Sequence, residues 1–380
     1  MALFTVNRKV ARGNNINIKS EVDMRKIIVK AIAFILICAF FAVSLVGCRG
    51  KSEDCSVLYY TFSDTYISSV RGAMDKALSD GGIIHHNYDA GTNQTTQTEQ
   101  VDTAIAKGTK VLLVNVVDTG SDDAARAIIG KAKAANIPLV FFNRSVKEEI
   151  VKEYANCVFV GTDYEEAGHI QGRLIGEYVR DNFEKLDING DGRISYVLFK
   201  GQQGNMEAEA RTRYAVEDCN AILSSAGLPS LLFYDKANKD GYLVDQNGAW
   251  SNAAANDYMK TILSGYSEAG GNMVELVIAN NDEMALGALA ALEEAGYNKA
   301  GKRYIPVFGV DATEAAKAKI RAGAMTGTVK QDGELMAKTI AKIAANMLAG
   351  RSMLDGIDTD MIAGEQRVNI PYSVYTGEDE

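Results

Sequence analysis

Histidine, proline and tryptophan are scarce in this chain, which has three, four and one of them among its 380 residues. The three histidines, His85, His86 and His169, leave little material for a multi-histidine metal site or a histidine-based catalytic triad. No proline-rich or glycine- and serine-rich linker divides the sequence, so we expect lobes joined by short crossings.

Positive charge is also scarce outside the N-terminal segment. Residues 1–47 hold seven basic and two acidic residues, whereas residues 48–380 hold 33 basic and 47 acidic residues, a net charge of −14. A body this acidic repels phosphate backbones, so we expect no nucleic-acid partner. Because 47% of the residues are apolar, the chain can bury a large core, and its length predicts two domains.

The N-terminal segment has the features of a bacterial lipoprotein signal. Arg25 and Lys26 precede an apolar run over 31–46, which is shorter than the roughly 20 residues of a spanning helix. The run ends in Leu-Val-Gly-Cys at 45–48, which resembles a lipobox, although an ordinary signal peptide with an incidental cysteine is an alternative. The pattern predicts a signal peptide with an over-extended start over 1–47, lipid on Cys48 and a tether over 48–55. We therefore expect a protein of the cell envelope, anchored to a membrane by lipid and facing the periplasm or the exterior.

The other cysteines do not form a recognisable framework. Cys55, Cys157 and Cys219 are odd in number and widely spaced, which fits neither a set of disulfides nor a zinc motif. We expect Cys157 and Cys219 to be small buried residues.

Strand-like and helical patterns alternate along the rest of the chain. One series has strands at 57–62, 111–116 and 138–142, with helical patterns over 66–77 and 121–135. A second series runs from a strand at 194–199 to one at 305–310, with helices over 207–225, 252–263 and 282–295. Alternation of this kind predicts an α/β fold with two doubly wound parallel-sheet lobes. We read the polar stretches 89–100 and 235–249 as surface loops.

Residues 187–195 match the first nine positions of an EF-hand calcium loop. Oxygens at the first, third, fifth and ninth positions come from Asp187, Asn189, Asp191 and Ser195, and Gly192 at the sixth position permits the sharp turn. The twelfth position is Leu198 instead of the usual glutamate, so one carboxylate must come from elsewhere. A solvated turn is the alternative, but the pattern favours a structural Ca²⁺ ion.

Polar residues also stand where a sheet of this type binds ligands. Asn143, Asn281 and Asp311 lie at or just after the ends of apolar strands, and the single tryptophan, Trp250, stands in a polar loop. Planar amide and carboxylate groups fix the donors and acceptors of sugar hydroxyls, and an aromatic face packs against a pyranose ring. Taken one at a time, Asn281 and Asp311 could be helix caps, as could Asp64 before the helical pattern that follows it, and Trp250 could be an aromatic anchor at the surface.

Residues 56–376 resemble the periplasmic glucose/galactose-binding proteins of bacterial ABC transporters. The collinear blocks are 138–143 (PLVFFN), 160–163 (VGTD), the loop at 187–195, 208–211 (AEAR), 279–282 (ANND), 306–311 (PVFGVD) and 327–329 (GTV). The resemblance implies a type I periplasmic binding protein whose lobes are joined by a three-crossing hinge, near 161–163, 328–331 and 365–370. The first lobe would comprise 56–162 and 332–366, and the second 163–331 and 367–380.

The resemblance also implies the ligands of a sugar. These are Tyr60, Asp64, Tyr66, Asn143, Asn205, Glu207, Arg211, Trp250, Asn281, Asp311 and Gln331. Tyr66, where the family usually has phenylalanine, would stack on one face of the ring and Trp250 on the other. Asn205, Glu207 and Gln331 replace a histidine, an aspartate and an asparagine of the family, which affects the preference among hexoses more than the substrate class.

For calcium, the resemblance implies a set that closes on a distant glutamate. Its members would be Asp187, Asn189, Asp191, the Arg193 carbonyl, Ser195 and Glu275.

The implied function is binding without catalysis. A lipid-anchored monomer would close around D-glucose or D-galactose and deliver it to the permease subunits of an ABC importer, with a chemoreceptor as a further partner. The main alternative is a nucleoside- or autoinducer-binding lipoprotein of the same fold. A glycosidase, with Asp64 and Glu207 as its carboxylates, is a weaker one.

Overall fold

The computed structural model describes residues 53–377, which form two α/β lobes. The expected signal peptide, Cys48 and most of the tether lie outside the described residues, so these remain predictions. No helix within residues 53–377 combines the length and the hydrophobicity that crossing a membrane would require.

The first lobe alternates strands with helices. Its strands are β1 (Cys55–Tyr59), β2 (His85–Asp89), β3 (Val111–Val114), β4 (Leu139–Asn143), β5 (Cys157–Gly161), β12 (Ile362–Gly364) and β13 (Arg367–Asn369). Its helices are α2 (Thr65–Asp80), α3 (Gln94–Ala106), α4 (Asp123–Ala134), α5 (Glu148–Val151), α11 (Gly333–Leu348) and the short 3-10 helix η2 (Thr359–Met361). Strands β1, β3 and β5 are buried along their whole length, as parallel strands covered on both faces should be.

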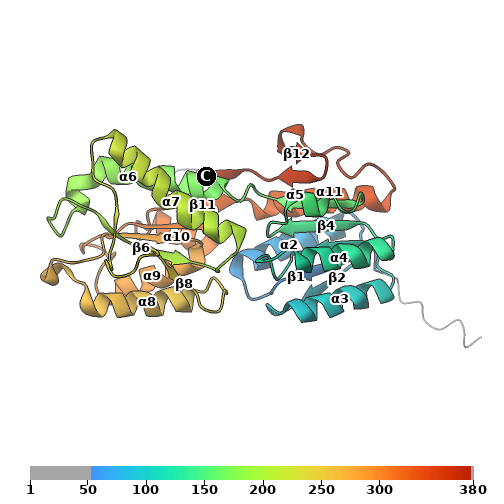
Figure 1. Ribbon diagram of the computed structural model, residues 1–380, viewed down its shortest axis with the longest axis horizontal. Coiled ribbons are helices and arrows are strands. Elements are labelled where there is room, and N and C mark those ends of the chain that lie inside the picture. The colour runs from blue at the N-terminus through green and yellow to red at the C-terminus, as the bar shows by residue number, and fades with distance from the viewer. Residues whose placement is uncertain (1–52, 378–380) are drawn as a thin grey trace, which may run out of the picture. The chain divides into compact units, whose positions relative to one another are not determined.

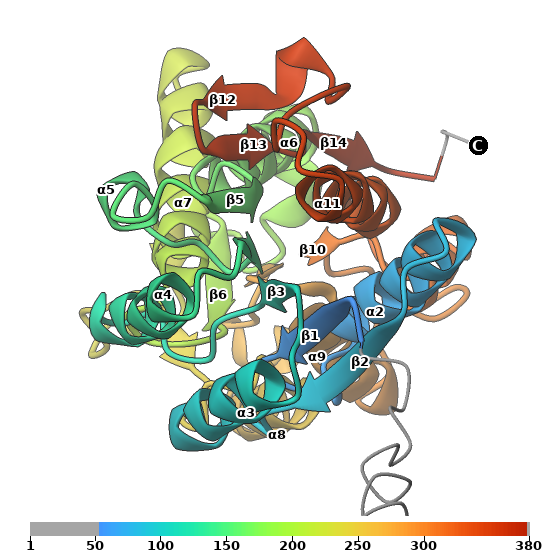
Figure 2. The ribbon, with the colours of Figure 1, turned by 90° about the vertical axis from the view of Figure 1, so that its right-hand side faces the viewer.

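Helices cover both faces of the first sheet. The strand order is β12-β13-β5-β4-β3-β1-β2, in which β12 pairs antiparallel with β13 and the other pairs are parallel. Helices α2 and α11 pack side by side on one face, and α3, α4 and α5 lie on the other (Figure 2). The lobe is therefore doubly wound, as predicted.

The second lobe repeats this plan. Its strands are β6 (Ser195–Lys200), β7 (Leu232–Phe233), β8 (Leu243–Val244), β9 (Leu276–Ala279), β10 (Val307–Asp311), β11 (Gly327–Gln331) and β14 (Tyr372–Tyr375). Its helices are α6 (Glu166–Leu186), α7 (Met206–Ser225), α8 (Asn252–Gly265), η1 (Glu268–Gly270), α9 (Asp282–Glu294) and α10 (Glu314–Arg321). The order is β14-β11-β10-β9-β6-β7, with β8 also on β6 and β14 antiparallel to β11.

In each sheet the first strand in the chain lies inside the sheet, β1 between β2 and β3, and β6 between β7 and β9. Doubly wound sheets with this order bind ligands at the carboxyl ends of the strands, next to the first one. The fold thus selects the loops after β1, β4, β6, β9 and β10 as the place to look for a site.

Three chain crossings join the lobes (Figure 1). They run from β5 to α6, from β11 to α11 and from β13 to β14. Residues 367–369 were expected in the second lobe, but β13 pairs with β5 in the first sheet. Val368 and Ile370 are buried in the core of the first lobe, so the third crossing follows Ile370.

One sequence-based expectation about loops was wrong. Most of the polar stretch 89–100 is helical, because α3 begins at Gln94, capped by the Asn93 side chain. The expectation for the cysteines is confirmed, since Cys157 and Cys219 are fully buried and carry no disulfide. Burial raises the pKa of the Cys219 thiol to about 12, so this residue is unreactive.

Candidate functional site

A small cavity of 50 Å³ lies where strand ends of both lobes meet. All eleven residues predicted to bind a sugar line this cavity, and two that the sequence analysis missed, Ile67 and Arg144, complete it. The lining residues are Tyr60, Asp64, Tyr66, Ile67, Asn143, Arg144, Asn205, Glu207, Arg211, Trp250, Asn281, Asp311 and Gln331. The structure therefore brings together side chains that are more than 270 positions apart in the sequence, from Tyr60 to Gln331.

The backbone is strained at three residues of the cavity. Asn143, Trp250 and Asp311 have φ angles of 62°, 56° and 119°, a region that residues other than glycine seldom adopt. Each such residue costs on the order of 1–3 kcal/mol and persists only where the surrounding fold fixes it. Three of the seven residues other than glycine that have positive φ angles within residues 53–377 line the cavity, which supports a functional site there.

The first lobe contributes a hydrogen-bonded group around Asp64. One Asp64 oxygen accepts the Ile67 N–H at 2.8 Å and caps α2, and the other accepts the Tyr60 hydroxyl at 2.5 Å. The Asn143 Oδ1 accepts from Asn115 at 3.1 Å, and Asn115 also accepts the Tyr60 N–H at 3.3 Å. The cap interpretation of Asp64 is thus correct, yet the same carboxylate faces the cavity.

Arg211 is the cation of the second lobe's wall. Its Nη1 donates to the Asn280 carbonyl at 2.8 Å and its Nη2 to the Tyr372 hydroxyl at 3.1 Å, whereas its buried Nε has no partner. The Nη1 lies 4.0 Å from the Asp311 carboxylate. Burial raises the pKa of Asp311 well above its usual range, and the positive charge of Arg211 opposes this rise.

Trp250 rests against the backbone of Gly201. A Cβ at position 201 would lie 2.1 Å from the indole ring, so only glycine allows the ring this close. Asn281 ties the same segment down, because its Nδ2 donates to the Trp250 carbonyl at 3.3 Å while its Oδ1 caps α9. The position of the aromatic wall is therefore set by Gly201 and Asn281.

Two predicted residues also reach across the cleft. Asn205 caps α7 through Oδ1 and donates from Nδ2 to the Thr119 hydroxyl of the first lobe at 3.1 Å, so both its polar groups already have partners. Glu207 accepts the Ser145 N–H on Oε1 at 2.8 Å, and its Oε2 is buried without a partner. Glu207, not Asn205, keeps an unused hydrogen-bonding atom.

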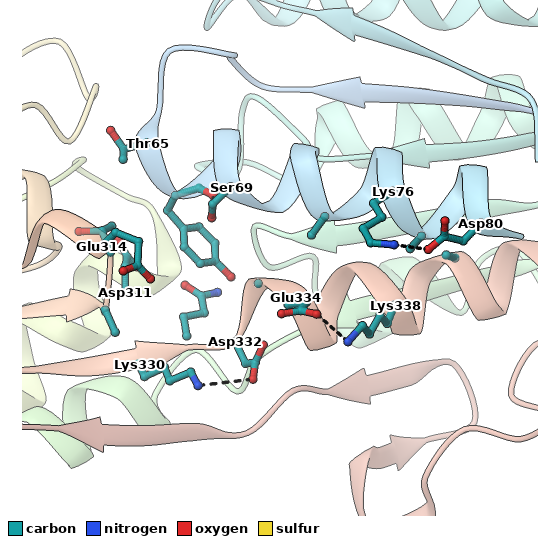
Figure 3. A pocket seen from close by; sticks show the side chains of 18 of the residues that line it. Thr65, Ser69, Lys76, Asp80, Asp311, Glu314, Lys330, Asp332, Glu334 and Lys338 are labelled. Atoms are coloured by element: carbon teal, nitrogen blue, oxygen red, sulfur yellow. Dashed lines mark hydrogen bonds and ion pairs between the residues drawn. The ribbon is translucent and has the colours of Figure 1, made fainter. Parts of the chain in front are cut away.

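A larger groove of 1180 Å³ adjoins the cavity (Figure 3). It runs along α2 and α11 to the β10–α10 connection and shares Tyr66, Asp311 and Gln331 with the cavity. Two ion pairs lie along it, Lys76 with Asp80 and Glu334 with Lys338 (Figure 3). The groove is thus a depression beside the site whose walls carry charged side chains of both signs.

Asp282 supports the site from behind. It is fully buried, and its carboxylate accepts the Thr313 N–H at 2.7 Å and the Thr328 hydroxyl at 2.7 Å. Thr313 caps α10 just after the strained residue Asp311, and Thr328 lies in the crossing strand β11. Burial raises the pKa of Asp282 to about 7.

Two of the predicted metal residues, Asn189 and Ser195, bond to Glu275, which lies far from them in the sequence. Glu275 accepts the Asn189 N–H and the Ser195 N–H, both at 2.8 Å, and Asp187 accepts the Asp191 N–H at 3.1 Å. The Arg193 N–H donates to Asp191 at 3.0 Å. The loop therefore closes on the carboxylate that the resemblance implied.

The donor set of this loop suits a hard cation. Asn189 Oδ1 is buried without a partner, and burial raises the pKa of Glu275, with the negative charge of Asp187 adding to the effect. No three His, Cys, Asp or Glu side chains within residues 53–377 converge as a metal site, so an ion here would also need amide, hydroxyl and carbonyl oxygens. Asn189 and Ser195 provide such oxygens.

Comparison with known sequences places this chain among transport proteins. A family model described as a periplasmic binding protein domain matches residues 55–352. The D-galactose/methyl-galactoside binding periplasmic protein of Haemophilus influenzae is 38% identical over 317 residues, covering 83% of this chain and 87% of that protein. The ribose import binding protein of Escherichia coli is 23% identical, covering 84% of this chain and 93% of that protein.

Solved structures support the same fold. An ABC transporter solute binding protein from Clostridium phytofermentans, with bound β-D-glucose, has a TM-score of 0.67 at 20% identity, covering 85% of this chain and 94% of its own. A periplasmic solute binding protein from Actinobacillus succinogenes, with bound D-allose, has a TM-score of 0.65 at 20% identity, covering 86% and 98%. At these identities the likeness shows the fold alone, which is that of the type I binding proteins. Together with the match over residues 55–352, it establishes that the chain belongs to the periplasmic binding protein family.

Proposed function

We propose that this protein is the substrate-binding component of an ABC importer and that it binds D-glucose, D-galactose or both. One observation carries the proposal. The cavity between the lobes is lined by carboxylate, amide and guanidinium groups around two aromatic side chains, Tyr66 and Trp250. A hexose is complementary to such a lining, because its hydroxyls donate and accept hydrogen bonds while its C–H faces pack on aromatic rings.

Unpartnered polar atoms give this proposal physical weight. Glu207 Oε2, Arg211 Nε and the Tyr66 hydroxyl are buried without hydrogen-bond partners, although each belongs to a lining residue. Leaving a buried polar atom unpaired costs about 1–3 kcal/mol, and more for a charged group. A polyhydroxylated ligand between these atoms would recover that free energy.

The galactoside-binding relative favours a hexose. The Haemophilus influenzae protein, 38% identical to this chain, is a D-galactose/methyl-galactoside binding protein. The other three proteins compared above are a ribose import binding protein and two proteins with bound allose or glucose, so the choice of sugar within the class rests on this chain's own residues. Asn205, Glu207 and Gln331 are the positions that would set the order of preference.

Binding would proceed by hinge closure. Asp64 and Asn143 come from the first lobe, whereas Arg211, Asn281 and Asp311 come from the second, so a sugar that contacts both sets binds the closed form better. That differential affinity shifts the equilibrium toward the closed form, which a permease would then recognise. We further propose that lipid on Cys48 anchors the protein in the cell envelope and that a chemoreceptor also reads the closed form.

The hydrogen bonds of Asp64 argue against a catalytic role for this carboxylate. Both Asp64 oxygens accept hydrogen bonds, from Ile67 N–H and from the Tyr60 hydroxyl, so this side chain is fixed as a cap and acceptor. We therefore propose a binding protein and not a glycosidase.

We also propose that the loop at 187–195 holds a structural Ca²⁺ ion together with Glu275. Its ligands would be Asp187, Asn189, Asp191, the Arg193 carbonyl, Ser195 and Glu275. The ion would supply positive charge among these oxygens, where Asn189 Oδ1 lacks a partner and burial raises the pKa of Glu275.

Calorimetric titration with D-glucose, D-galactose, ribose and adenosine tests the proposed function. We expect a saturable heat with at least one of the two hexoses and weaker or no heat with ribose and adenosine. Preferential binding of adenosine would instead support a nucleoside carrier, and turnover of nitrophenyl hexosides would support a glycosidase. Failure of both hexoses to bind would refute the proposal.

A further inference from the structure

Arg144 is the one charged residue of the cavity that the sequence analysis missed. It follows Asn143 directly after β4, and only 6% of it is exposed. Its Nη1 donates to the Val117 carbonyl at 2.5 Å and to the Val116 carbonyl at 3.3 Å, at the end of the neighbouring strand β3. Its guanidinium lies over the Tyr60 ring, 4.4 Å from the centroid. The side chain is therefore held against three loops of the first lobe.

The same guanidinium also reaches the second lobe. Arg144 Nη2 donates to Gln202 Oε1, in the loop that follows β6. Two further hydrogen bonds join the lobes beside it, from Ser145 N–H to Glu207 Oε1 at 2.8 Å and from Asn205 Nδ2 to the Thr119 hydroxyl at 3.1 Å. These bonds link protein to protein directly, so they stabilise the closed cleft without a ligand between them.

Gln202 allows the contact between the lobes to be tested apart from the cavity, because Gln202 does not line the cavity, whereas Arg144 does. A contact between Gln202 and a bound sugar is thus not part of this arrangement. Any effect of Gln202 on binding must pass through Arg144 or through the closure of the lobes.

We propose that Arg144 is a positioning residue that latches the two lobes together through Gln202 and so slows release of the ligand. This inference rests on the proposed sugar-binding function. The planar fork of arginine bonds two carbonyls on one side and an amide oxygen on the other, which the single ammonium group of lysine cannot reproduce. Because the Gln202 bond must break before the cleft opens, the latch acts on dissociation more than on association.

The latch also changes the equilibrium of the ligand-free protein. Contacts that exist only in the closed form raise its population, and the apparent affinity rises with the closed fraction. Arg144 holds Tyr60, whose hydroxyl bonds to Asp64, so the residue that closes the cleft also sets the position of a ligand-binding carboxylate.

The test compares Arg144→Lys, Gln202→Ala and the double variant by stopped-flow tryptophan fluorescence with the hexose that the wild type binds. We expect each single variant to raise the dissociation rate about five- to tenfold while the association rate changes less than about twofold. The double variant should be no faster than Arg144→Lys alone, because both changes break the same bond. Arg71→Lys, which alters a guanidinium stacked on Phe62 at 3.9 Å in the first lobe alone, is the matched control.

Small-angle scattering without ligand gives a second measurement. The radius of gyration of ligand-free Gln202→Ala should exceed that of the wild type, and Arg71→Lys should match the wild type. An unchanged dissociation rate in Gln202→Ala together with unchanged scattering would overturn the latch. If the wild type binds no hexose, the proposed function fails, but the scattering comparison still decides whether Arg144 and Gln202 hold the lobes together.

Discussion

Single side chains at the cleft combine a structural task with a place in the cavity wall. Asp64, Asn205 and Asn281 each accept a backbone N–H at the start of a helix, at 2.8, 2.9 and 3.0 Å. These helices begin at the carboxyl ends of strands, where the ligand site of such a sheet lies. Cap and ligand contact, which the sequence posed as alternatives, are therefore compatible at Asp64 and Asn281.

Replacement of Trp250 by alanine should nearly abolish hexose binding. The indole is buried against Gly201, and Trp250 is the only tryptophan in the sequence. We expect affinity to fall about a hundredfold or more, because a large buried aromatic contact and its shape are lost. Calorimetric titration of Trp250→Ala measures the loss.

Gly201→Ala tests the contribution of the Trp250 indole indirectly. Its added Cβ must displace the ring, so affinity should fall in the same direction, whereas Gly130→Ala on α4 adds a methyl group where nothing lies within 4 Å. Affinity unchanged in both Trp250→Ala and Gly201→Ala would remove the indole from the binding site.

Asp282 should make folding stability depend on pH near neutrality. Burial raises its pKa from 3.8 to about 7, so the folded protein favours the protonated carboxyl. This contribution to stability is fully present below the unfolded pKa and is lost as pH rises through about 7. Between pH 5 and 8, the urea midpoint of the wild type should therefore fall more steeply than that of Asp282→Asn.

The control for this comparison removes an exposed carboxylate instead of a buried one. Glu283 and Asp311 add negative charge around Asp282, and Arg211 faces Asp311. The exposed Asp257→Asn on α8 should keep the steep profile of the wild type. Parallel profiles for Asp282→Asn and the wild type would contradict the assignment.

At the scale of elements, the sequence predicted several whose buried faces are apolar. The helix expected over 207–225 is α7 (Met206–Ser225), and the strand over 138–142 lies within one residue of β4. Helix α3 was not predicted, because only Gln97, Val101 and Ala104 of its residues are buried. Helices α6 and α11 were not predicted either, although apolar residues such as Ile175 and Ile340 are buried on them. Glycines let α6 approach α7 closely, since a Cβ on Gly172 would lie 2.4 Å from a backbone oxygen.

The loop at 187–195 gives the prediction at this scale. We expect Ca²⁺ to raise the melting temperature of the wild type relative to chelator, and Asp191→Asn to shrink this difference by removing one carboxylate. Glu275 is a poor choice for the test, because it also accepts two backbone N–H groups and its loss would destabilise the loop without any ion. Differential scanning fluorimetry with Ca²⁺ and with chelator provides the measurement.

Asp240→Asn is the control for the calcium experiment. It lies in an exposed turn whose N–H groups bond to Asn238, in a stretch of similar composition but different spacing. The Ca²⁺ effect should persist in Asp240→Asn. A wild type whose melting temperature is the same with Ca²⁺ and with chelator would refute the proposed ion.

At the scale of the molecule, the members of the cavity wall could be predicted, whereas the contacts across it could not. Strand ends such as Asn143 and Asp311 are readable from the sequence, because parallel strands bring their carboxyl ends to one edge. The contact between Arg144 and Gln202 depends on how the two sheets are placed relative to each other, and no local sequence pattern predicts it. The same holds for the third crossing, which is set by burial of Val368 in the first core.

The hinge and the site meet at Tyr372, which yields the prediction for the whole molecule. Its hydroxyl lies 2.9 Å from the Thr162 hydroxyl in one crossing and accepts from Arg211 in the cavity wall at 3.1 Å. Tyr372→Phe would leave the buried Arg211 Nη2 unpaired and disconnect two crossings. We expect affinity for hexose to fall about tenfold and ligand-induced compaction to weaken. Calorimetry measures the affinity, and small-angle scattering measures the compaction. Tyr375→Phe is the control, because Tyr375 lies on the same strand as Tyr372 and its hydroxyl accepts from Arg321 on α10. If Tyr372→Phe binds and closes like Tyr375→Phe, the hinge does not act on the site through this hydroxyl.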